Sequence, residues 1–256
     1  MKIVVSVKQV PARDSALKVN AAGTWLDESD LSFEMNEPDA YALEEALQLK
    51  EKLGGEVVVP SAGPARVAQT IREALAKGAD RAIHVTVDDE GTLDALATAR
   101  ILAKALASES PDLILTGLQS DDLGYGQTGV VLAELLGFAH ATIVMEVEPL
   151  GSTVRVKREL EDGWFQNVIL QLPAVLTVQS GIKKLRYATL MGIKKAKTKE
   201  VKTLSSADLG VDAKAAARIE KVYLPSRGKQ SQILTGDAKD VAKQLVEKLK
   251  FEARVI

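Results

Sequence analysis

The first half of the chain alternates short β-branched runs with stretches of helical periodicity. Four compact apolar runs have the pattern of buried strands, at residues 2–7, 56–59, 81–85 and 112–116. Between and after them, one-sided apolar periodicity predicts helices that begin near Asp39, Pro64, Thr92 and Gln127. Strands and helices that alternate in this way predict an α/β fold with a doubly wound, mainly parallel sheet.

The pattern changes after residue 141. Short strands separated by turns are predicted at residues 142–147, 154–157, 167–170 and 174–178, and they could extend the sheet with antiparallel members. From Ser180 onward there is little strand signal, until a terminal helix near Asp237 with one apolar face. Because such a segment buries little against itself, we expect two parts, 1–180 and 181–256, with the second packed on its own domain or on a partner.

Composition narrows the functional classes. The 256 residues include no cysteine and two histidines, which excludes disulfides, iron–sulfur clusters and cysteine-based zinc sites. A redox role would therefore belong to an organic cofactor. The net charge of −2 gives no indication of nucleic acid as a partner. The sequence shows neither a signal-peptide pattern nor an apolar run long enough to span a membrane. We therefore expect no membrane insertion, and a cytoplasmic location in a bacterium or the mitochondrial matrix in a eukaryote.

Three segments at strand ends could bind a ligand, because open parallel sheets bind ligands beyond the carboxyl ends of their strands. They are Ser6–Lys8, Ser61–Pro64 and Gly117–Gly129, and the third has the sequence GLQSDDLGYGQTG. Its glycines and the helix that follows would let backbone N–H groups approach a phosphate closely. It matches neither the Walker loop nor the G-x-G-x-x-G fingerprint. From spacing alone, an ordinary glycine-rich connection explains this loop equally well.

The adjacent acids Asp121 and Asp122 suggest a metal or acid–base site. No third ligand or histidine accompanies them nearby in the sequence, and adjacent side chains point in different directions, so we expect no metal site. No nucleophile–base pair is recognisable elsewhere. We therefore expect a protein without catalytic residues of its own rather than a complete enzyme.

Six segments follow one another along the chain: KIVVSVKQV, EMNEPDAYALEEALQLKE, GPARVAQTIREALAKGADRAIHV, GLQSDDLGYGQTG, VKRELEDGWFQNVILQLPAVLTV and RYATLMGIKKAKTK. Together they resemble the beta subunit of electron transfer flavoprotein over essentially the whole chain. The resemblance implies a Rossmann-like, adenine nucleotide-binding domain at 1–180. It also implies that 181–256 forms a docking loop and an arm, ending in the terminal helix, that wraps a partner subunit.

The resemblance further implies partners and cofactors. Members of this family pair with a larger alpha subunit as a heterodimer. The alpha subunit holds most of the FAD that carries the electrons, and the beta subunit binds a structural AMP. Acyl-CoA or amine dehydrogenases would donate electrons, and a quinone reductase or another acceptor would receive them. By position, the AMP pocket would use Ser6, Asn36, Glu37, Pro38, Asp39, Ala62, Gly117, Gln119, Ser120, Asp121, Asp122, Leu123, Gly124, Tyr125, Gly126, Gln127 and Thr128.

A further segment is similar to the family's docking loop, in which a protruding leucine anchors on partner dehydrogenases. That leucine is Leu190, and the lysines after it would steer an acidic partner. From the residues alone, a buried leucine and a solvated lysine face would be the preferred interpretation. The docking residues by position are Tyr187, Ala188, Thr189, Leu190, Met191, Gly192, Ile193, Lys194, Lys195 and Lys197. Glu159 matches a family acid that can face the flavin domain of the alpha subunit.

Some positions depart from the family pattern. Arg13 and Pro38 stand where some members place aromatic side chains against the flavin, and Gly126 replaces a side chain able to hydrogen-bond. Flavin-bifurcating relatives bind a second FAD in place of AMP and carry an Asp-Gly-Asp-Thr-Ala-Gln run, whereas residues 122–127 of this chain read DLGYGQ, which favours AMP. A third hypothesis is a stand-alone adenine-nucleotide sensor on the same fold, which the long C-terminal region disfavours.

Overall fold

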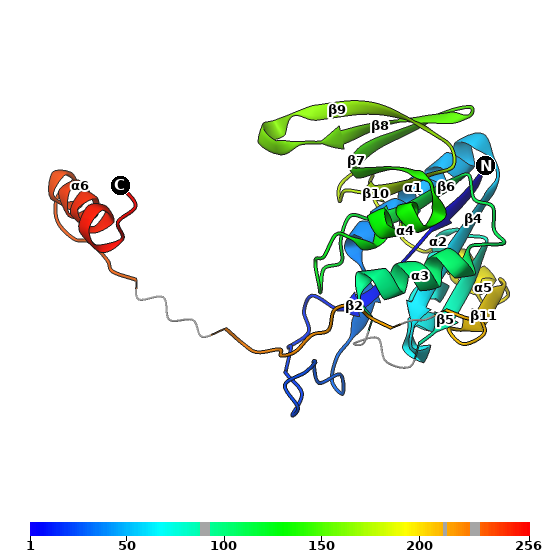
Figure 1. Cartoon of the computed structure of the whole chain (residues 1–256), viewed down its shortest axis with the longest axis horizontal. Helices are drawn as coiled ribbons and strands as arrows, with labels where there is room; N and C mark the ends of the chain where they lie inside the picture. Colours follow the sequence, from blue (N-terminus) through cyan, green and yellow to red (C-terminus); the bar gives the residue numbers. More distant parts are fainter. Residues whose placement is uncertain (88–92, 212–213, 226–230) are drawn as a thin grey trace. The chain divides into compact units, whose positions relative to one another are not determined.

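The computed structural model describes residues 1–87, 93–211, 214–225 and 231–256. Contacts divide the chain into two units, Met1–Val222 and Tyr223–Ile256. The first unit contains a nine-stranded sheet in the order β11-β5-β4-β1-β6-β10-β7-β8-β9 (Figure 1). The strands of this sheet are β1 (Lys2–Val5), β4 (Glu56–Gly63), β5 (Arg81–Thr86), β6 (Leu113–Gly117), β7 (Ala139–Leu150), β8 (Thr153–Glu159), β9 (Phe165–Gln171), β10 (Ala174–Val178) and β11 (Val201–Ser205).

Neighbouring strands from β11 to β7 run parallel, and β8 and β9 extend the sheet in antiparallel fashion. The predicted α/β fold with a mainly parallel, doubly wound sheet is confirmed. Helices of the first unit are α1 (Glu37–Leu53), α2 (Ala68–Lys77), α3 (Ala95–Ala105), α4 (Thr128–Leu136) and α5 (Leu190–Ala196). A small antiparallel pair, β2 (Gln9–Pro11) and β3 (Phe33–Met35), lies outside the main sheet.

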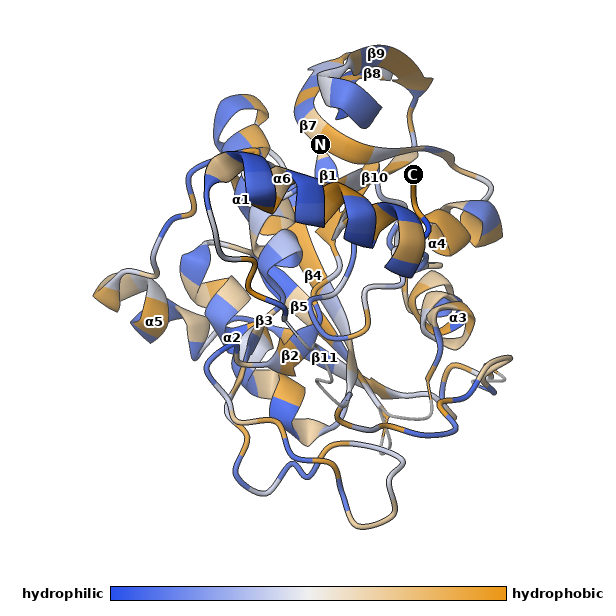
Figure 2. Ribbon diagram, turned by 90° about the vertical axis from the view of Figure 1, so that its left-hand side faces the viewer, coloured by the Kyte–Doolittle hydropathy of each residue, from blue (hydrophilic) through white to orange (hydrophobic). Residues whose placement is uncertain are grey.

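Alternate residues of the central strands supply two hydrophobic cores. In β1, Ile3 and Val5 join the cluster that packs against α1 and α2, whereas Val4 joins the cluster that packs against α3 and α4. Because successive strand residues face opposite sides of a sheet, a continuous β-branched run is what two covered faces require. Figure 2 shows apolar residues along the central strands and a mixture of polar and apolar residues along the helices.

Three features of the first unit differ from the sequence-based expectation. Residues 201–205 form an edge strand paired in parallel with β5, although no strand was expected after residue 180. The expected docking loop contains the short helix α5, which Thr189 caps by accepting a hydrogen bond from the Gly192 N–H. The expected cap Thr92 lies outside the described residues, and Asp94 caps α3 instead. Short or edge elements of this kind carry too little apolar periodicity to be recognised.

The second unit, Tyr223–Ile256, contains α6 (Ala238–Glu247), continued by a π-helical turn at Lys248–Glu252. The helix is amphipathic, and Asp237 caps it by accepting hydrogen bonds from the N–H groups of Lys239 and Asp240. No residue of this helix is buried, and several large apolar side chains of the unit are exposed: Leu224, Ile233, Leu245, Val246 and Phe251. The division of the chain into a nucleotide-binding domain at 1–180 and a docking loop and partner-wrapping arm at 181–256 stays a prediction.

Candidate functional site

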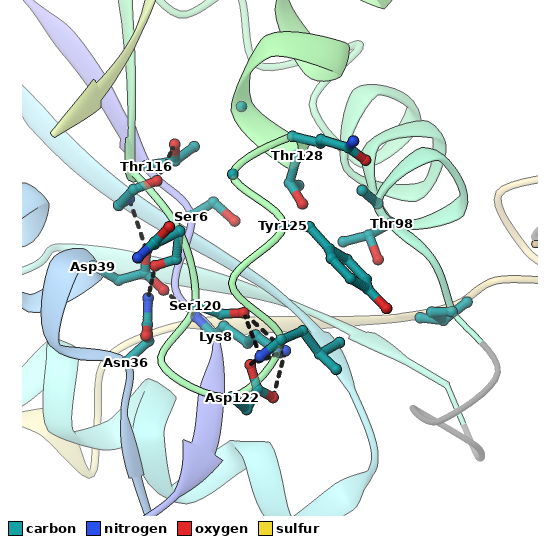
Figure 3. A pocket seen from close by; sticks show the side chains of 18 of the residues that line it. Ser6, Lys8, Asn36, Asp39, Thr98, Thr116, Ser120, Asp122, Tyr125 and Thr128 are labelled. Carbon is teal, nitrogen blue, oxygen red and sulfur yellow. Dashed lines mark hydrogen bonds and ion pairs between the residues drawn. The ribbon is translucent and has the colours of Figure 1, made fainter. Parts of the chain in front are cut away.

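A pocket opens at the carboxyl ends of β1, β4 and β6 (Figure 3). At this point successive strands change side: β4 and β5 lie on one side of β1, and β6 lies on the other. The N-terminal ends of α3 and α4 border the pocket from the other side. Such a switch point is where open α/β sheets bind their ligands, since the connections leaving adjacent strands diverge there. The three strand-end segments indicated by the sequence, Ser6–Lys8, Ser61–Pro64 and Gly117–Gly129, all contribute to the pocket wall.

Close packing fixes both ends of the loop Gly117–Gly129. A Cβ atom on Gly117 would lie 2.5 Å from Oδ1 of Asp39, and a Cβ on Gly129 would lie 2.6 Å from Cγ2 of Thr177. Both distances are too short for real contacts, so only glycine allows β6 to meet α1 and allows α4 to pack on β10 at these points. The first turn of α4 therefore begins directly at the sheet edge and directs its N–H groups towards the pocket.

Asp39, in the first turn of α1, connects two strand ends. Its carboxylate accepts hydrogen bonds from the backbone N–H of Gly117 (2.7 Å) and of Lys8 (2.8 Å). Burial raises the pKa of this carboxyl to about 6, while the two backbone N–H groups act in the opposite direction. The group holds the backbones that leave β1 and β6 in register at the floor of the pocket.

Asn36 and Asp121 hold the middle of the loop. The Asn36 amide donates to the Gln119 carbonyl oxygen (3.0 Å) and accepts from the Asp121 N–H (2.9 Å). Asp121 in turn accepts from the backbone N–H of Glu37 (3.2 Å) and lies 3.4 Å from the Arg13 guanidinium. Arg13 also pairs with the carboxylate of Glu37. Asp121 is therefore engaged in fixing the loop to the start of α1.

Lys8 and Asp122 form an ion pair inside the pocket wall. The Lys8 ammonium lies 2.7 Å and 2.6 Å from the two carboxylate oxygens of Asp122, and 3.5 Å from the Ser120 hydroxyl. Figure 3 shows this pair at one end of the pocket, with Thr116 and Thr128 at the other. Burial acts to raise the pKa of Asp122, but Lys8, with the hydrogen bonds from Ser120 and the Leu123 N–H, outweighs it, so the pKa lies below the ordinary value.

Most of the residues expected in a nucleotide site line this one pocket. They are Ser6, Asn36, Asp39, Ala62, Gly117, Gln119, Ser120, Asp122, Leu123, Tyr125, Gly126, Gln127 and Thr128. Four expected residues do not line it, and the first three of these support its wall from behind: Glu37, Pro38, Asp121 and Gly124.

Several lining residues were not anticipated. Leu93 and the cap Asp94 come from the start of α3, and Ala95, Thr98 and Leu102 come from the helix itself. The sequence between β5 and α3 contains one glycine, Gly91, and no proline, which is too weak a signal to have identified them. Trp25 comes from a long excursion without periodicity, so no sequence pattern indicated it. Thr116 closes a strand that was predicted, and Val7, Lys8, Leu118 and Gly129 lie within the indicated segments.

The expected docking residues lie on an exposed segment that contacts α1 and α2. Tyr187 is 94% exposed and Leu190 is 88% exposed, so the leucine is not a core residue. Behind them, the Arg186 guanidinium donates to both oxygens of Glu44 (2.7 and 3.0 Å) and to Glu51 (2.6 Å) on α1. Gly192 brings α5 against the Ala76 carbonyl oxygen, where a Cβ would not fit. The apolar tip is thus exposed on a segment that α1 and α2 hold in place.

Glu159 lies at the hairpin end of the antiparallel extension. Its carboxylate accepts from the Gln179 side chain at 3.5 Å. A shallow pocket brings it together with Ile143, Leu160, Glu161, Asp162 and Trp164. Trp164 is 72% exposed beside these three acids. An exposed indole among carboxylates is suited to contact with a cationic or apolar surface.

Two kinds of feature are absent from the described residues. Within this part of the chain, no group of three or more His, Asp or Glu residues is arranged to hold a metal ion. Among the same residues, no helix combines the length and apolar character needed to cross a membrane.

Comparisons with known proteins give a consistent result. A sequence model of the electron transfer flavoprotein domain matches residues 23–209. The electron transfer flavoprotein subunit beta of Bradyrhizobium diazoefficiens is 42% identical over 259 residues, which cover 100% of both chains. The protein of the same name from Methylophilus methylotrophus is 40% identical over 243 residues, covering 91% of this chain and 92% of the relative. The human one is 37% identical over 258 residues, covering 100% of this chain and 99% of the relative.

Proposed function

The chain belongs to the electron transfer flavoprotein family, as a beta subunit, and from this premise we propose that it pairs with an alpha subunit to carry electrons on FAD. In this proposal the electrons come from acyl-CoA or amine dehydrogenases and pass to a quinone reductase or another acceptor. The pocket of the beta subunit holds a structural AMP. The protein works in the bacterial cytoplasm, or in the mitochondrial matrix if the source is a eukaryote.

The observation that carries the AMP assignment is the pocket at the switch point of the sheet. It combines the N-terminal donors of α4 with the hydroxyls of Ser6, Thr98 and Thr128 and with the side chain of Gln127. Oriented N–H groups and hydroxyls are the donors that a phosphate accepts from. Tyr125 and Trp25 add aromatic faces suited to a base. The donor set therefore fits a mononucleotide.

We assign the flavin mainly to the alpha subunit, as the family resemblance implies. The chain has no cysteine, and FAD would supply the redox chemistry when bound to the heterodimer. Arg13 and Pro38, the positions where some relatives contact flavin, are not among the residues that line the pocket. We assign to Glu159 and Trp164, at the hairpin end, the contact with the flavin-bearing part of the alpha subunit.

The exposed apolar residues of the second unit support a partner subunit. Leu224, Ile233 and Phe251 expose large hydrophobic surfaces that an obligate interface would bury. This observation disfavours a stand-alone nucleotide sensor. Leu190 supplies an apolar anchor for a transient dehydrogenase partner, and Lys194 and Lys195, in the last turn of the same helix, supply positive charge that attracts an acidic surface.

Co-expression with a cognate alpha chain tests the proposal. We expect a yellow heterodimer whose flavin is bleached by an acyl-CoA or amine dehydrogenase with its substrate, and is reoxidised by a quinone reductase. The beta chain expressed alone, at the same concentration, serves as the control and should not accept electrons. A colourless complex, or a stable adenine-nucleotide-binding beta monomer that ignores the alpha chain, would refute the proposal.

A further inference from the structure

The strand β7 contains a strained residue beside the shallow pocket at the hairpin end. Ile143 has a φ of +58°, and of the four non-glycine residues with positive φ in the described part of the chain it is the one with a β-branched side chain. Such a residue rarely adopts the left-handed region, because its side chain crowds the backbone there. The conformation therefore costs free energy, and it persists because the surrounding structure imposes it.

A β-bulge moves Ile143 out of the core. Ala141 and Val144 are 5% and 0% exposed, and both belong to the cluster that packs against α1 and α2, although they are three residues apart. In a regular strand, residues two apart share a face, so residue 143 would follow Ala141 into that core. The pairing with β10 shows the extra residue, since Ala141 pairs with Leu176 and Val144 pairs with Val178.

Hydrogen bonds hold the backbone on both sides of Ile143. The Arg158 guanidinium donates to the carbonyl oxygen of Thr142 (3.1 Å) and to its hydroxyl (3.0 Å). On the other side, the Gln179 N–H donates to the carbonyl oxygen of Val144 (3.0 Å). Ile143 therefore cannot relax to an extended conformation without disturbing these bonds and the strand pairing around them.

The bulge places Ile143 at a surface with mixed chemistry. Half-buried, it lines the shallow pocket together with Leu160 and Trp164. Three acids line the same pocket: Glu159, Glu161 and Asp162. Apolar side chains can pack against the stem of an arginine or lysine, while carboxylates and an indole attract its charged end. This surface is therefore complementary to a cationic side chain of a partner.

We propose that the strained bulge at Ile143 is a contact for the alpha subunit: it holds the isoleucine in the pocket, where it packs against the stem of a cationic residue of alpha. The inference rests on the proposed heterodimer and adds a third residue to the contact assigned to Glu159 and Trp164. A second copy of this chain fits less well, because a symmetric contact through the same pocket would bring two sets of acids together.

Subunit exchange tests the inference on the alpha–beta complex itself. Complexes with isotope-labelled and unlabelled subunits are mixed, and mass spectrometry follows the mixed pairs, which form at a rate set by dissociation. Ile143→Asn tolerates the left-handed backbone but removes the apolar contact, so we expect exchange about tenfold faster than in wild type. Ile143→Val keeps most of the contact and should accelerate exchange only about twofold.

Leu150→Asn is the matched control. It introduces the same side chain at a position of the same strand that is 46% exposed and outside the pocket, so exchange should stay within about twofold of wild type. Ile143→Gly separates contact from local structure, and it also serves if Ile143→Asn assembles poorly. Because glycine adopts positive φ without strain, hydrogen exchange of amides 142–147 should be no faster than in wild type, while subunit exchange accelerates about tenfold. A purely structural role would not separate these two readouts.

The outcomes separate the inference from the function on which it rests. If the cognate alpha chain forms no complex, the proposed heterodimer is wrong. If the complex forms but Ile143→Asn and Ile143→Gly exchange at the wild-type rate, or Leu150→Asn accelerates exchange equally, the contact role of Ile143 is wrong while the heterodimer stands. A wild-type assembly of two alpha–beta pairs that Ile143→Asn splits into single pairs would assign the pocket to a second copy and would also overturn the inference.

Discussion

Replacing Arg186 with methionine tests whether the docking segment depends on its anchor to α1. The change removes the bidentate contact of the guanidinium with Glu44 and its contact with Glu51, but keeps an apolar stem of similar length. In the wild type the Glu44 side chain is 4% exposed. After the substitution, the one remaining side-chain donor to its carboxylate in the described part of the chain is the Gln48 amide, at 2.7 Å.

The magnitude follows from the burial of Glu44. Removing one partner of a fully buried ion pair costs about 3–5 kcal/mol, because the other charge is left uncompensated. Since Gln48 remains and the Arg186 side chain is 29% exposed, we expect about 2–3 kcal/mol. Burial acts to raise the pKa of Glu44, yet Arg186 and Gln48 hold it below the ordinary value of 4.5. The pair therefore stabilises the fold above that pH and loses its effect as pH falls through the lowered pKa.

Hydrogen exchange of the heterodimer, followed by mass spectrometry, measures this locally. In Arg186→Met, the opening free energy of amides in 186–197 should fall by about 2–3 kcal/mol at pH 7 and by much less near pH 4. Glu44→Gln in the same background should recover part of the loss, since no buried charge remains. Lys184→Met, which removes an exposed charge from the same segment, is the control. A loss below about 0.5 kcal/mol at pH 7, or an equal loss in the control, would refute the anchoring role of Arg186.

Three further predictions concern the docking tip, the pocket floor and the loop end. Leu190→Ala should raise the KM for the dehydrogenase about tenfold or more while leaving the bound flavin and its spectrum unchanged, as steady-state kinetics would show; an unaltered KM would contradict the docking role. The raised pKa of Asp39, about 6, means that its ionisation costs stability as pH rises from about 4 to 6. Wild type should therefore lose stability relative to Asp39→Asn over that range in thermal melts, and a pH-independent difference would contradict this. Gly129→Ala should destabilise by about 1–3 kcal/mol in urea unfolding, because its Cβ would overlap Thr177; a neutral effect would mean that α4 can shift freely.

The sequence predicts the centre of the fold better than its edges. The β-branched run that forms β1 and the glycine that ends α1 carry strong local signals, and both elements occur where expected. The edge strand β11 has mixed polarity and is only partly covered along its length, and α5 is a helix of only seven residues, so neither produces a detectable period. The local sequence pattern identifies elements that are buried, whereas elements at the edge of the fold form through contacts with residues distant in the sequence.

The candidate site shows the same limit. Glycine spacing and strand ends indicated the loop Gly117–Gly129, but not the residues that reach the pocket from distant parts of the chain. Asp94 enters from the start of α3, and Trp25 from an aperiodic excursion. The pairing of Lys8 with Asp122 joins residues separated by 114 positions, which no local pattern can reveal. Asp121 and Asp122 are adjacent in sequence, yet they engage different partners, Arg13 and Lys8.

The most direct test of the proposed function is the nucleotide content of the purified alpha–beta heterodimer. After acid release and chromatography, we predict one FAD and one AMP per heterodimer, with the AMP lost in variants that disrupt the Gly117–Gly129 loop. Two flavins and no AMP would assign the pocket to a second FAD and contradict the AMP assignment. No adenine nucleotide beyond a single FAD would contradict the pocket assignment itself.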